Sequence, residues 1–402
     1  MVTRKKRRIA AVPEQPSGSL ALQMPPEKAE PASMGNVLMM VVPMLGSTGV
    51  MIFMAMQNNG GGRSMLMGGG MLVAMLGMVG FNMYRQFSQY RTRVKTQRRE
   101  YLSYLAETRE SIRKVAKKQR AYYNWVYPDP DALVTLAANG SRLWSREGNT
   151  YDVLTFRYGS GTQPLGLTFE RPPIDPMTEM DVVCLSAMER FIAVHDHTDN
   201  VGKFLYLGDF SHIEVVGEGE SAYDEMRAIM MHLACFIEPS KLKIAVLCSA
   251  DRLGDWEWVK WMPQARSANV RDAIGPARMI STDPRELVEM IGPDIAMRGA
   301  YRPGEEMPEW PHLLLVCDGA EFPTSSPFGS MAGVRGVTIM SRAREWTPMK
   351  SHTALRLVIH PSPDRKGSDV VDVVTMDSVP ESAFADRLSA VQAEAVARRM
   401  TP

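Results

Sequence analysis

Two long uncharged stretches near the N-terminus constrain this chain more than any other feature. The first, 37–56, reads VLMMVVPMLGSTGVMIFMAM, and the second, 65–84, follows after the turn QNNGGGRS. An α-helix rises about 1.5 Å per residue, so each stretch matches the roughly 30 Å hydrocarbon core of a bilayer. A cleaved signal peptide does not fit, because the first stretch starts far from the N-terminus and a second one follows. The sequence therefore predicts a membrane helical hairpin within residues 34–84.

Basic residues flank the predicted hairpin on both sides. Residues 4–8 precede it, whereas the turn between the two stretches carries only Arg63. The cations that follow the hairpin are Arg85, Arg91, Arg93 and Lys95. Because cationic flanks remain on the cytoplasmic side, the pattern predicts a multi-pass protein of the inner (plasma) membrane with both termini in the cytoplasm. Residues 1–33, rich in Pro, Glu, Gln and Ser, are predicted to be a disordered tail.

A long helical stalk is predicted to follow, within residues 85–140. From Arg85 to Arg120 there are 12 Lys and Arg against 3 Asp and Glu, and neither Pro nor Gly interrupts the run. Tyr101 and Leu105 belong to a narrow apolar stripe at helical spacing, which favours packing on a partner helix. We expect the cations to contact anionic lipid headgroups. Nucleic-acid binding is the alternative use of such a charge run.

The remaining residues, 141–402, show the pattern of an α/β domain ending in a linker helix. Apolar runs such as IAVLC and LLLVC alternate with helical segments, which is typical of a mostly parallel sheet covered by helices on both faces. The strands are expected at 211–216, 243–249, 312–318, 334–340 and 355–360, and the main helices at 178–193, 222–236 and 284–291. From Ala121 onward, 27 basic residues stand against 39 acidic ones. This negative balance argues against a nucleic-acid partner.

A glycine-rich turn between a strand and a helix is the candidate nucleotide site. Gly217, Gly219 and Ser221 stand where the backbone of a P-loop cradles phosphate, and Asp318 ends an apolar strand as a Walker B carboxylate does. However, no lysine follows Gly219, and the turn itself carries two glutamates that oppose a triphosphate. We therefore expect a degenerate P-loop NTPase domain with no catalytic residue and no cofactor. The alternative is an NTPase domain that binds or hydrolyses ATP with Mg²⁺.

Other chemistry-bearing residues favour structural roles. The four cysteines are widely separated in apolar runs, which indicates buried reduced thiols rather than a metal or redox site. His195-Asp196-His197 is interpreted as a solvated helix end, so no metal site is predicted. Trp256 and Trp258, in the run DWEWVKWMP, are interpreted as anchors of the core or of an interface.

Several of these segments together resemble a known family. They are RLWSREGNTYDVLTFRYGSG, MRAIMMHLACFIEP, WEWVKWMP followed by DAIGPARM, and PHLLLVCDG, together with the two apolar stretches and the basic stalk. In these features the chain resembles the N-terminal region of the EccC family, the FtsK/SpoIIIE-like motor ATPases of actinobacterial type VII (ESX) secretion systems. The resemblance covers nearly the whole chain.

The resemblance implies a role and a set of partners. It implies a degenerate ATPase-like domain between the stalk and downstream motor domains that carry proper Walker motifs, and no such motor is present here. The chain would then anchor and couple the motor to a hexameric secretion pore, as a fragment or a split subunit. The implied partners are EccB, EccD and EccE and further copies of the chain, while secreted substrates bind the downstream domains. A DNA translocase of the FtsK type is the rival reading, and it predicts salt-sensitive binding to duplex DNA.

Overall fold

The chain forms two compact units. The computed structural model describes residues 12–29, 63–148, 151–303, 309–343, 348–349 and 351–401, together with single residues and pairs between 39 and 57. The helical unit comprises residues 16–116 and 165–196. The sheet unit comprises residues 117–164 and 197–402 together with the first 15 residues.

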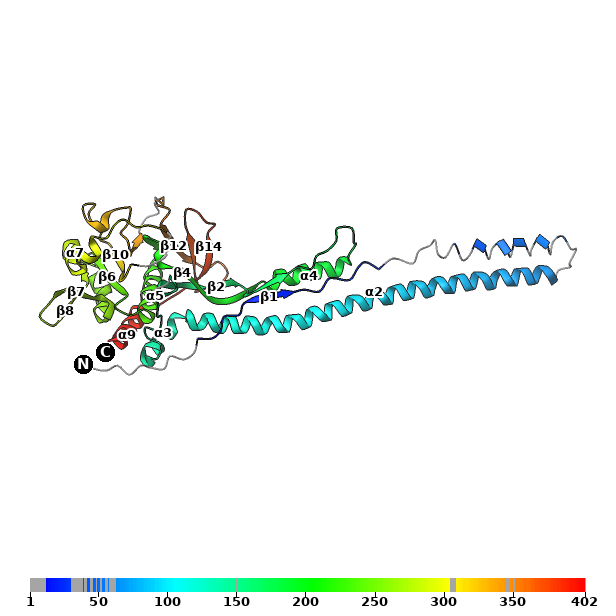
Figure 1. Cartoon of the computed structure of the whole chain (residues 1–402), viewed down its shortest axis with the longest axis horizontal. Coiled ribbons are helices and arrows are strands. Elements are labelled where there is room, and N and C mark those ends of the chain that lie inside the picture. The colour runs from blue at the N-terminus through cyan, green and yellow to red at the C-terminus, as the bar shows by residue number, and fades with distance from the viewer. Residues whose placement is uncertain are drawn as a thin grey trace. The chain divides into compact units, whose positions relative to one another are not determined.

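One long helix dominates the helical unit. Helix α2 (Arg63–Val126) has 64 residues, and from Lys117 onward its residues belong to the sheet unit. No proline interrupts it, so its hydrogen-bond ladder is continuous over this length. The other elements of the helical unit are β1 (Gly18–Ala21), β3 (Leu167–Glu170) and α4 (Val182–His195). Strand β1, labelled in Figure 1, pairs in parallel with β3, with Gly18 opposite Leu167.

The apolar stripe predicted for the stalk is buried within the helical unit. Tyr101 and Leu105 are 6% and 4% exposed. They belong to a cluster with Leu22 of the N-terminal segment and with Met188 and Phe191 of α4. Within the part of the chain that the structure describes, this stripe therefore packs on the chain's own segments.

The predicted membrane hairpin is wrong. Among the residues that the structure describes, no helix is both long and apolar enough to cross a bilayer. The first predicted span, 37–56, lies mostly outside the described residues, and the second, 65–84, is the beginning of α2. The helix that contains the second stretch does not end there, because α2 continues into the charged residues from Arg85 onward. The multi-pass inner-membrane location, which rested on the hairpin, is corrected with it.

The N-terminal tail is not disordered throughout. Its residues 18–21 form β1, and the backbone amide of Leu22 donates to the carbonyl of Glu170 at 3.1 Å. Further on, the amide of Asp181 donates to the carbonyl of Pro26 at 2.9 Å. The prediction failed because it used only the composition of the tail. Composition does not show that a strand distant in the sequence supplies hydrogen-bond partners for the tail's backbone. Residues 1–11 and 30–33 lie outside the described part.

A ten-stranded mixed sheet forms the centre of the sheet unit, in the order β4-β2-β14-β13-β12-β5-β11-β10-β6-β9. Its strands are β2 (Thr155–Pro164), β4 (His197–Tyr206), β5 (His212–Gly217), β6 (Leu242–Cys248), β9 (Ile280–Ser281), β10 (His312–Asp318), β11 (Val337–Ala343), β12 (Ala354–Pro361), β13 (Asp369–Val374) and β14 (Glu381–Ala385). A separate pair consists of β7 (Arg266–Arg271) and β8 (Pro276–Arg278). The helices of this unit are α3 (Pro130–Asn139), α5 (Ser221–Phe236), α6 (Leu253–Trp256), α7 (Pro284–Ile291), α8 (Pro293–Ala296) and α9 (Ala390–Met400).

The sheet is mixed rather than mostly parallel. From β12 to β9 every neighbouring pair is parallel, and from β12 to β4 every pair is antiparallel. Strand β13 follows β12 after a short connection, and a short connection returns the chain antiparallel because a parallel crossover needs a dozen residues or more. The five predicted strands lie in the parallel half and match β5, β6, β10, β11 and β12.

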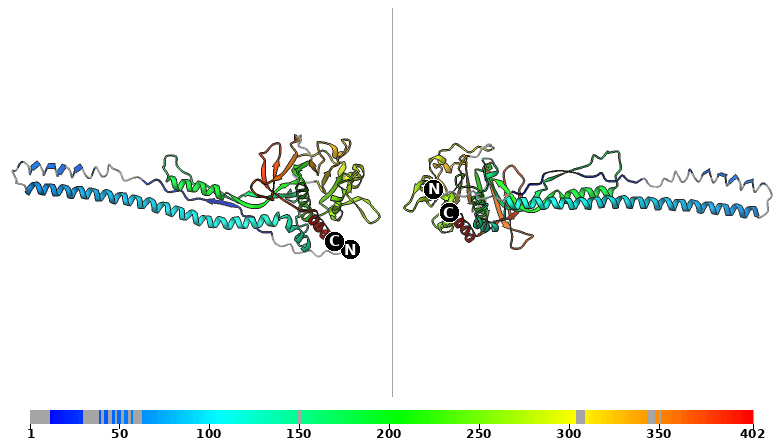
Figure 2. Two further views of the ribbon diagram at one scale, coloured as in Figure 1. Left: turned by 180° about the vertical axis from the view of Figure 1, so that it is seen from behind. Right: turned by 60° about the horizontal axis from the view of Figure 1, so that its bottom comes forward.

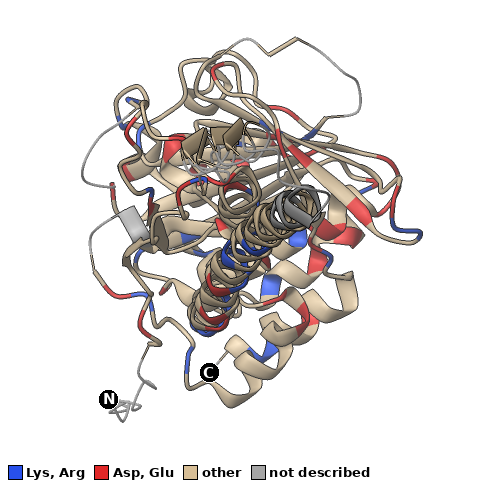
Figure 3. Cartoon of the chain, turned by 90° about the vertical axis from the view of Figure 1, so that its right-hand side faces the viewer, with Lys and Arg blue, Asp and Glu red and all other residues tan. Residues whose placement is uncertain are grey.

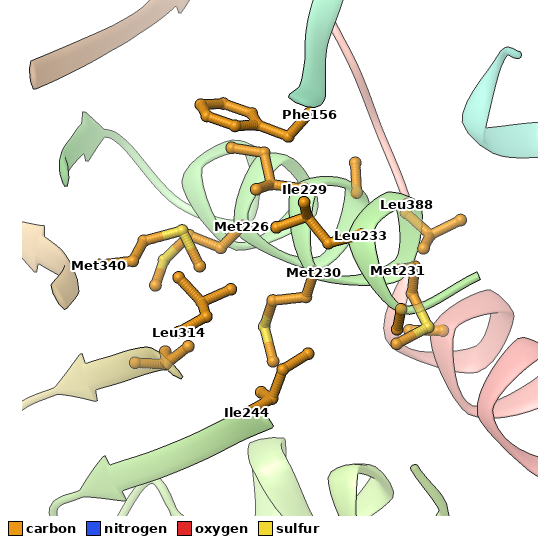
Figure 4. Close-up of a cluster of buried hydrophobic side chains, with 14 of the residues drawn as sticks. Phe156, Met226, Ile229, Met230, Met231, Leu233, Ile244, Leu314, Met340 and Leu388 are labelled. Carbon is orange, nitrogen blue, oxygen red and sulfur yellow. The ribbon is translucent and has the colours of Figure 1, made fainter. Parts of the chain in front are cut away.

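Helices cover both faces of the parallel half, as predicted. Alternate residues of β10 enter two separate clusters, with Leu314 on the α5 face and Leu315 on the α7 face. Helix α5 is buried around nearly its whole circumference, which a helix tolerates only when it is apolar on most sides. Figure 4 shows Met226, Ile229 and Met230 of this helix among side chains from the neighbouring strands. Helices α3 and α9 pack against each other beside α5 in the views of Figures 1 and 2.

Candidate functional site

The predicted phosphate turn joins β5 to α5, as the sequence indicated. Gly217 ends the strand, and a Cβ added there would lie 3.2 Å from the Cβ of Ile359 and 3.3 Å from that of Ala222. Gly219 has a φ of +58°, a conformation that suits glycine. Both glycines are therefore explained by the geometry of the turn itself.

The start of α5 is occupied by contacts within the protein. The Ser221 hydroxyl donates to the carbonyl of Glu218 at 2.7 Å. The guanidinium of Arg227 lies 3.0 Å from the carboxylate of Glu220 and 2.7 Å from that of Asp224. Carboxylates beside a helix N-terminus stabilise the helix dipole, but they repel a phosphate. The residues of this turn therefore do not fit the phosphates of a nucleoside triphosphate.

Asp318 lies at the carboxyl end of β10 and is committed to the protein interior. It is 1% exposed. Its Oδ1 accepts from the Tyr223 hydroxyl at 3.2 Å, and its Oδ2 accepts from Trp256 Nε1 at 2.9 Å and Arg252 Nε at 3.2 Å. A Walker B carboxylate must reach Mg²⁺ and its waters, whereas both oxygens of Asp318 are engaged by side chains. No group of three or more His, Cys, Asp or Glu suited to a metal ion occurs among the described residues.

Tyr223 is held between two arginines at this site. The Cζ atoms of Arg252 and Arg342 lie 4.5 and 4.6 Å from the centroid of its ring. Burial, and then the charge of Asp318, raise the pKa of the Tyr223 hydroxyl, so it stays protonated and donates at neutral pH. Arg342 also donates to the carbonyl of Gly217 at 3.5 Å. We name Tyr223, Arg252, Trp256 and Asp318 the Asp318 network. These side chains link the first turn of α5 to the end of β10.

The predicted tryptophan anchors lie in the interior of the sheet unit. Trp256 and Trp258 are 1% and 5% exposed, and their ring centroids are 6.3 Å apart. Trp256 belongs to the Asp318 network, a role that the sequence did not indicate. Trp258 lies in the short helical turn Glu257–Trp261, which packs against α9.

The predicted contact cations, Arg85, Arg91, Arg93 and Lys95, are all exposed on α2, where Figure 3 marks Lys and Arg in blue. The sequence did not single out the neighbouring Arg98. Its Nε and Nη2 lie 2.9 and 2.8 Å from Oδ2 of Asp181. Asp181 also accepts from the amides of Val183 and Cys184, and so caps α4. The contact with Arg98 holds the pKa of Asp181 below its usual value although burial opposes this.

The fold and this site define an α/β protein with a mixed sheet, in which a glycine-containing turn joins β5 to α5 and the carboxylate at the end of β10 is engaged by side chains of the protein itself. No protein-family model matches the chain. It is 30% identical over 410 residues to the ESX secretion system protein EccC of Thermomonospora curvata, across 100% of this chain and 30% of that protein. The chain belongs to the EccC family of ESX secretion proteins.

Relatives from other ESX loci agree with this membership. The chain is 33% identical over 249 residues to EccC3 of ESX-3 from Mycobacterium tuberculosis, covering 61% of this chain and 18% of that protein. It is 28% identical over 406 residues to EccC5 of ESX-5 from the same species, covering 96% and 28%. The chain thus spans less than a third of the length of these relatives.

Among solved structures, the cytoplasmic domain of the Thermomonospora curvata type VII secretion ATPase EccC also matches. The match has a TM-score of 0.28 at 14% identity, and it covers 47% of this chain and 25% of that one. A similarity this low carries no argument about the fold.

Proposed function

We propose that this chain is a coupling module of a type VII secretion motor. It links FtsK-like motor domains to the rest of the secretion complex and transmits their movement without hydrolysing nucleotide itself. The family membership supports a place in an ESX secretion system. The non-catalytic role is supported by the Asp318 network, in which side chains of the protein engage both oxygens of the carboxylate that the sequence placed at the Walker B position.

The proposed partners are other components of the same secretion complex, EccB, EccD and EccE, and further copies of the chain. The cations Arg85, Arg91, Arg93 and Lys95 are exposed along α2 and are suited to contacts with acidic residues of a partner. Reversing the charge of Arg91, Arg93 and Lys95 together should weaken co-purification of these components and leave the fold of the chain unchanged. Normal co-purification in this variant would remove these cations from the proposal.

Nucleotide titration of the purified chain tests the non-catalytic role directly. We expect no saturable binding of ATP with Mg²⁺ at millimolar concentration and no release of phosphate. Secretion should be lost when the gene is deleted and restored equally by the wild-type gene and by Ser221→Ala, since Ser221 serves only the turn. Micromolar ATP affinity with Mg²⁺-dependent turnover that Ser221→Ala abolishes would establish the NTPase alternative. Salt-sensitive binding of duplex DNA would instead favour the translocase reading.

A further inference from the structure

The end of α2 presents three backbone carbonyls that each meet a different arginine. The carbonyls of Trp125, Val126 and Tyr127 accept hydrogen bonds from Arg142, Arg146 and Arg157, in that order. Arg146 Nη2 lies 3.1 Å from the Val126 oxygen, and Arg157 Nη1 lies 3.0 Å from the Tyr127 oxygen. We name these three arginines the arginine cap.

The arginine cap supplies what α2 lacks. The last carbonyls of a helix have no partner within the helix, and the helix dipole places partial negative charge there. Helix α2 has no basic residue in its own last turn. The cations come instead from the segment after α3 and from β2, so the end of α2 is bound by elements of the sheet unit.

Packing fixes the cap in one geometry. Arg142 and Arg157 are 9% and 4% exposed. The Cζ of Arg142 lies 3.9 Å from the centroid of the Trp125 ring, and that of Arg146 lies 5.4 Å from the centroid of the Tyr127 ring. Burial lowers the pKa of Arg146 to about 10, so it keeps its charge at neutral pH. Planar guanidinium groups stacked on rings hold their hydrogen bonds in a defined direction.

Arg157 also binds the entry to the C-terminal helix. Its Nε and Nη2 donate to the two oxygens of Asp386 at 2.8 and 2.9 Å, and both side chains are 4% exposed. Asp386 stands between β14 and α9. One buried side chain thus holds the end of α2 and the start of α9 at the same time.

A second contact runs beside this pair. Gln392 of α9 donates to Asp131 of α3 at 2.9 Å, and Ser389 caps α9. Arg227 of α5 donates to the carbonyl of Leu388, immediately before that cap, at 2.8 Å. The start of α9 is therefore fastened to α3, to α5 and, through Asp386, to the arginine cap.

We propose that the arginine cap is a mechanical joint, which passes movement of α2 through Arg157 and Asp386 to α9. The inference rests on the proposed function and names the residues within the chain where the coupling takes place. A helix end whose carbonyls face water frays independently of its surroundings, whereas one bound by buried guanidinium groups opens only when its partners open.

Hydrogen exchange on the full 402-residue chain tests the joint with Arg157→Lys. Arg157 Nη2 also donates to a carboxylate oxygen of Asp129 at 3.4 Å. Lysine keeps the charge but cannot bind Tyr127, Asp386 and Asp129 together. We expect exchange to become faster by at least about tenfold in both residues 123–127 and residues 390–394. Arg356→Lys is the matched control, because Arg356 is also a buried arginine, 1% exposed, and its carboxylate partner is Glu214 of β5 rather than a residue at either helix end. Its effect should stay within β5 and β12.

Faster exchange at only one of the two helix ends would overturn the joint. If Arg157→Lys does not fold, Asp386→Asn gives the same test, since it keeps the shape of the side chain and weakens only the link from Arg157. Secretion by cells carrying Arg157→Lys in the complete gene separates the two proposals. Reduced secretion at a normal protein level supports both the joint and the coupling function. Faster exchange at both helix ends with unchanged secretion supports the joint but shows that secretion does not depend on it.

Discussion

Removing the carboxylate of Asp318 tests how much this side chain contributes to the stability of the fold. In Asp318→Ala, the donors of Tyr223, Trp256 and Arg252 lose their common acceptor. Tyr223 and Trp256 are 4% and 1% exposed, and an unsatisfied buried donor costs about 1–3 kcal/mol. The Arg252 side chain is 25% exposed, so water recovers part of its loss. We therefore expect a destabilisation of about 3–5 kcal/mol, the range found when one partner of a buried ion pair is removed.

Urea unfolding followed by tryptophan fluorescence is the appropriate assay. All seven tryptophans lie in sequence ranges of the sheet unit, so their emission reports on that unit. The midpoint should fall while the slope with denaturant stays constant. Asp318→Asn keeps one acceptor oxygen and should lose about 1–2 kcal/mol. Asp364→Ala, at an exposed position, should stay within about 0.5 kcal/mol of wild type.

A loss below about 1 kcal/mol in Asp318→Ala would refute the reasoning. It would mean that the three donors find other partners without cost and that the carboxylate is held for a ligand rather than for the fold. Nucleotide titration of the same variant would then decide whether that ligand is a metal–nucleotide complex.

Three further predictions follow from other parts of the structure. Trp258→Ala should destabilise the sheet unit by about 3–5 kcal/mol in the same urea assay, since the ring is buried. A change near zero would show that the ring does not contribute to the stability of the core. Asp181→Ala removes the cap of α4 and the contact with Arg98, and should lower the stability of this helix end by about 1–2 kcal/mol. Amide hydrogen exchange at residues 182–185 should become faster. Unchanged exchange there would contradict the capping role. Burial lowers the pKa of His312 to about 3, so between pH 6.5 and 3 the unfolded chain binds a proton that the folded chain does not. The free energy of unfolding should therefore fall by about 2 kcal/mol from pH 7 to pH 5. The fall should be smaller in His312→Asn, whose side chain can still form a hydrogen bond with Thr338. An equal fall in this variant would exclude His312 as the cause.

The parallel half of the sheet could be predicted because its strands are buried on both faces. Runs such as IAVLC and LLLVC have no polar alternation, and the helices between them have clear ends, such as the Asp283 cap of α7. The antiparallel half gives a weaker signal. Strand β4 reads HTDNVGKFLY, in which polar residues hide the pattern, and it pairs with β2 through two register shifts.

The residues of the site could be placed from the sequence, but their contacts could not. The segment that ends in Asp318 was recognisable as a strand, yet the donors that engage it come from 62 to 95 positions earlier in the chain. The arginine cap lies in RLWSREGNTYDVLTFRYGSG, the segment that carried the family resemblance. In the sequence, the feature that pointed to the cap was a long helix without a basic residue in its last turn. The hairpin prediction failed because an apolar composition does not distinguish a bilayer-spanning helix from the beginning of a longer one.

The pairing of β1 with β3 has a consequence for synthesis on the ribosome. Gly18–Ala21 emerges long before Leu167–Glu170, its only partner strand among the described residues. Until then the early strand exposes an open edge, which invites pairing with other nascent chains. An affinity tag fused close to Pro16 would sit beside that edge in the nascent chain, so yield and aggregation should differ between the tagged and the untagged protein.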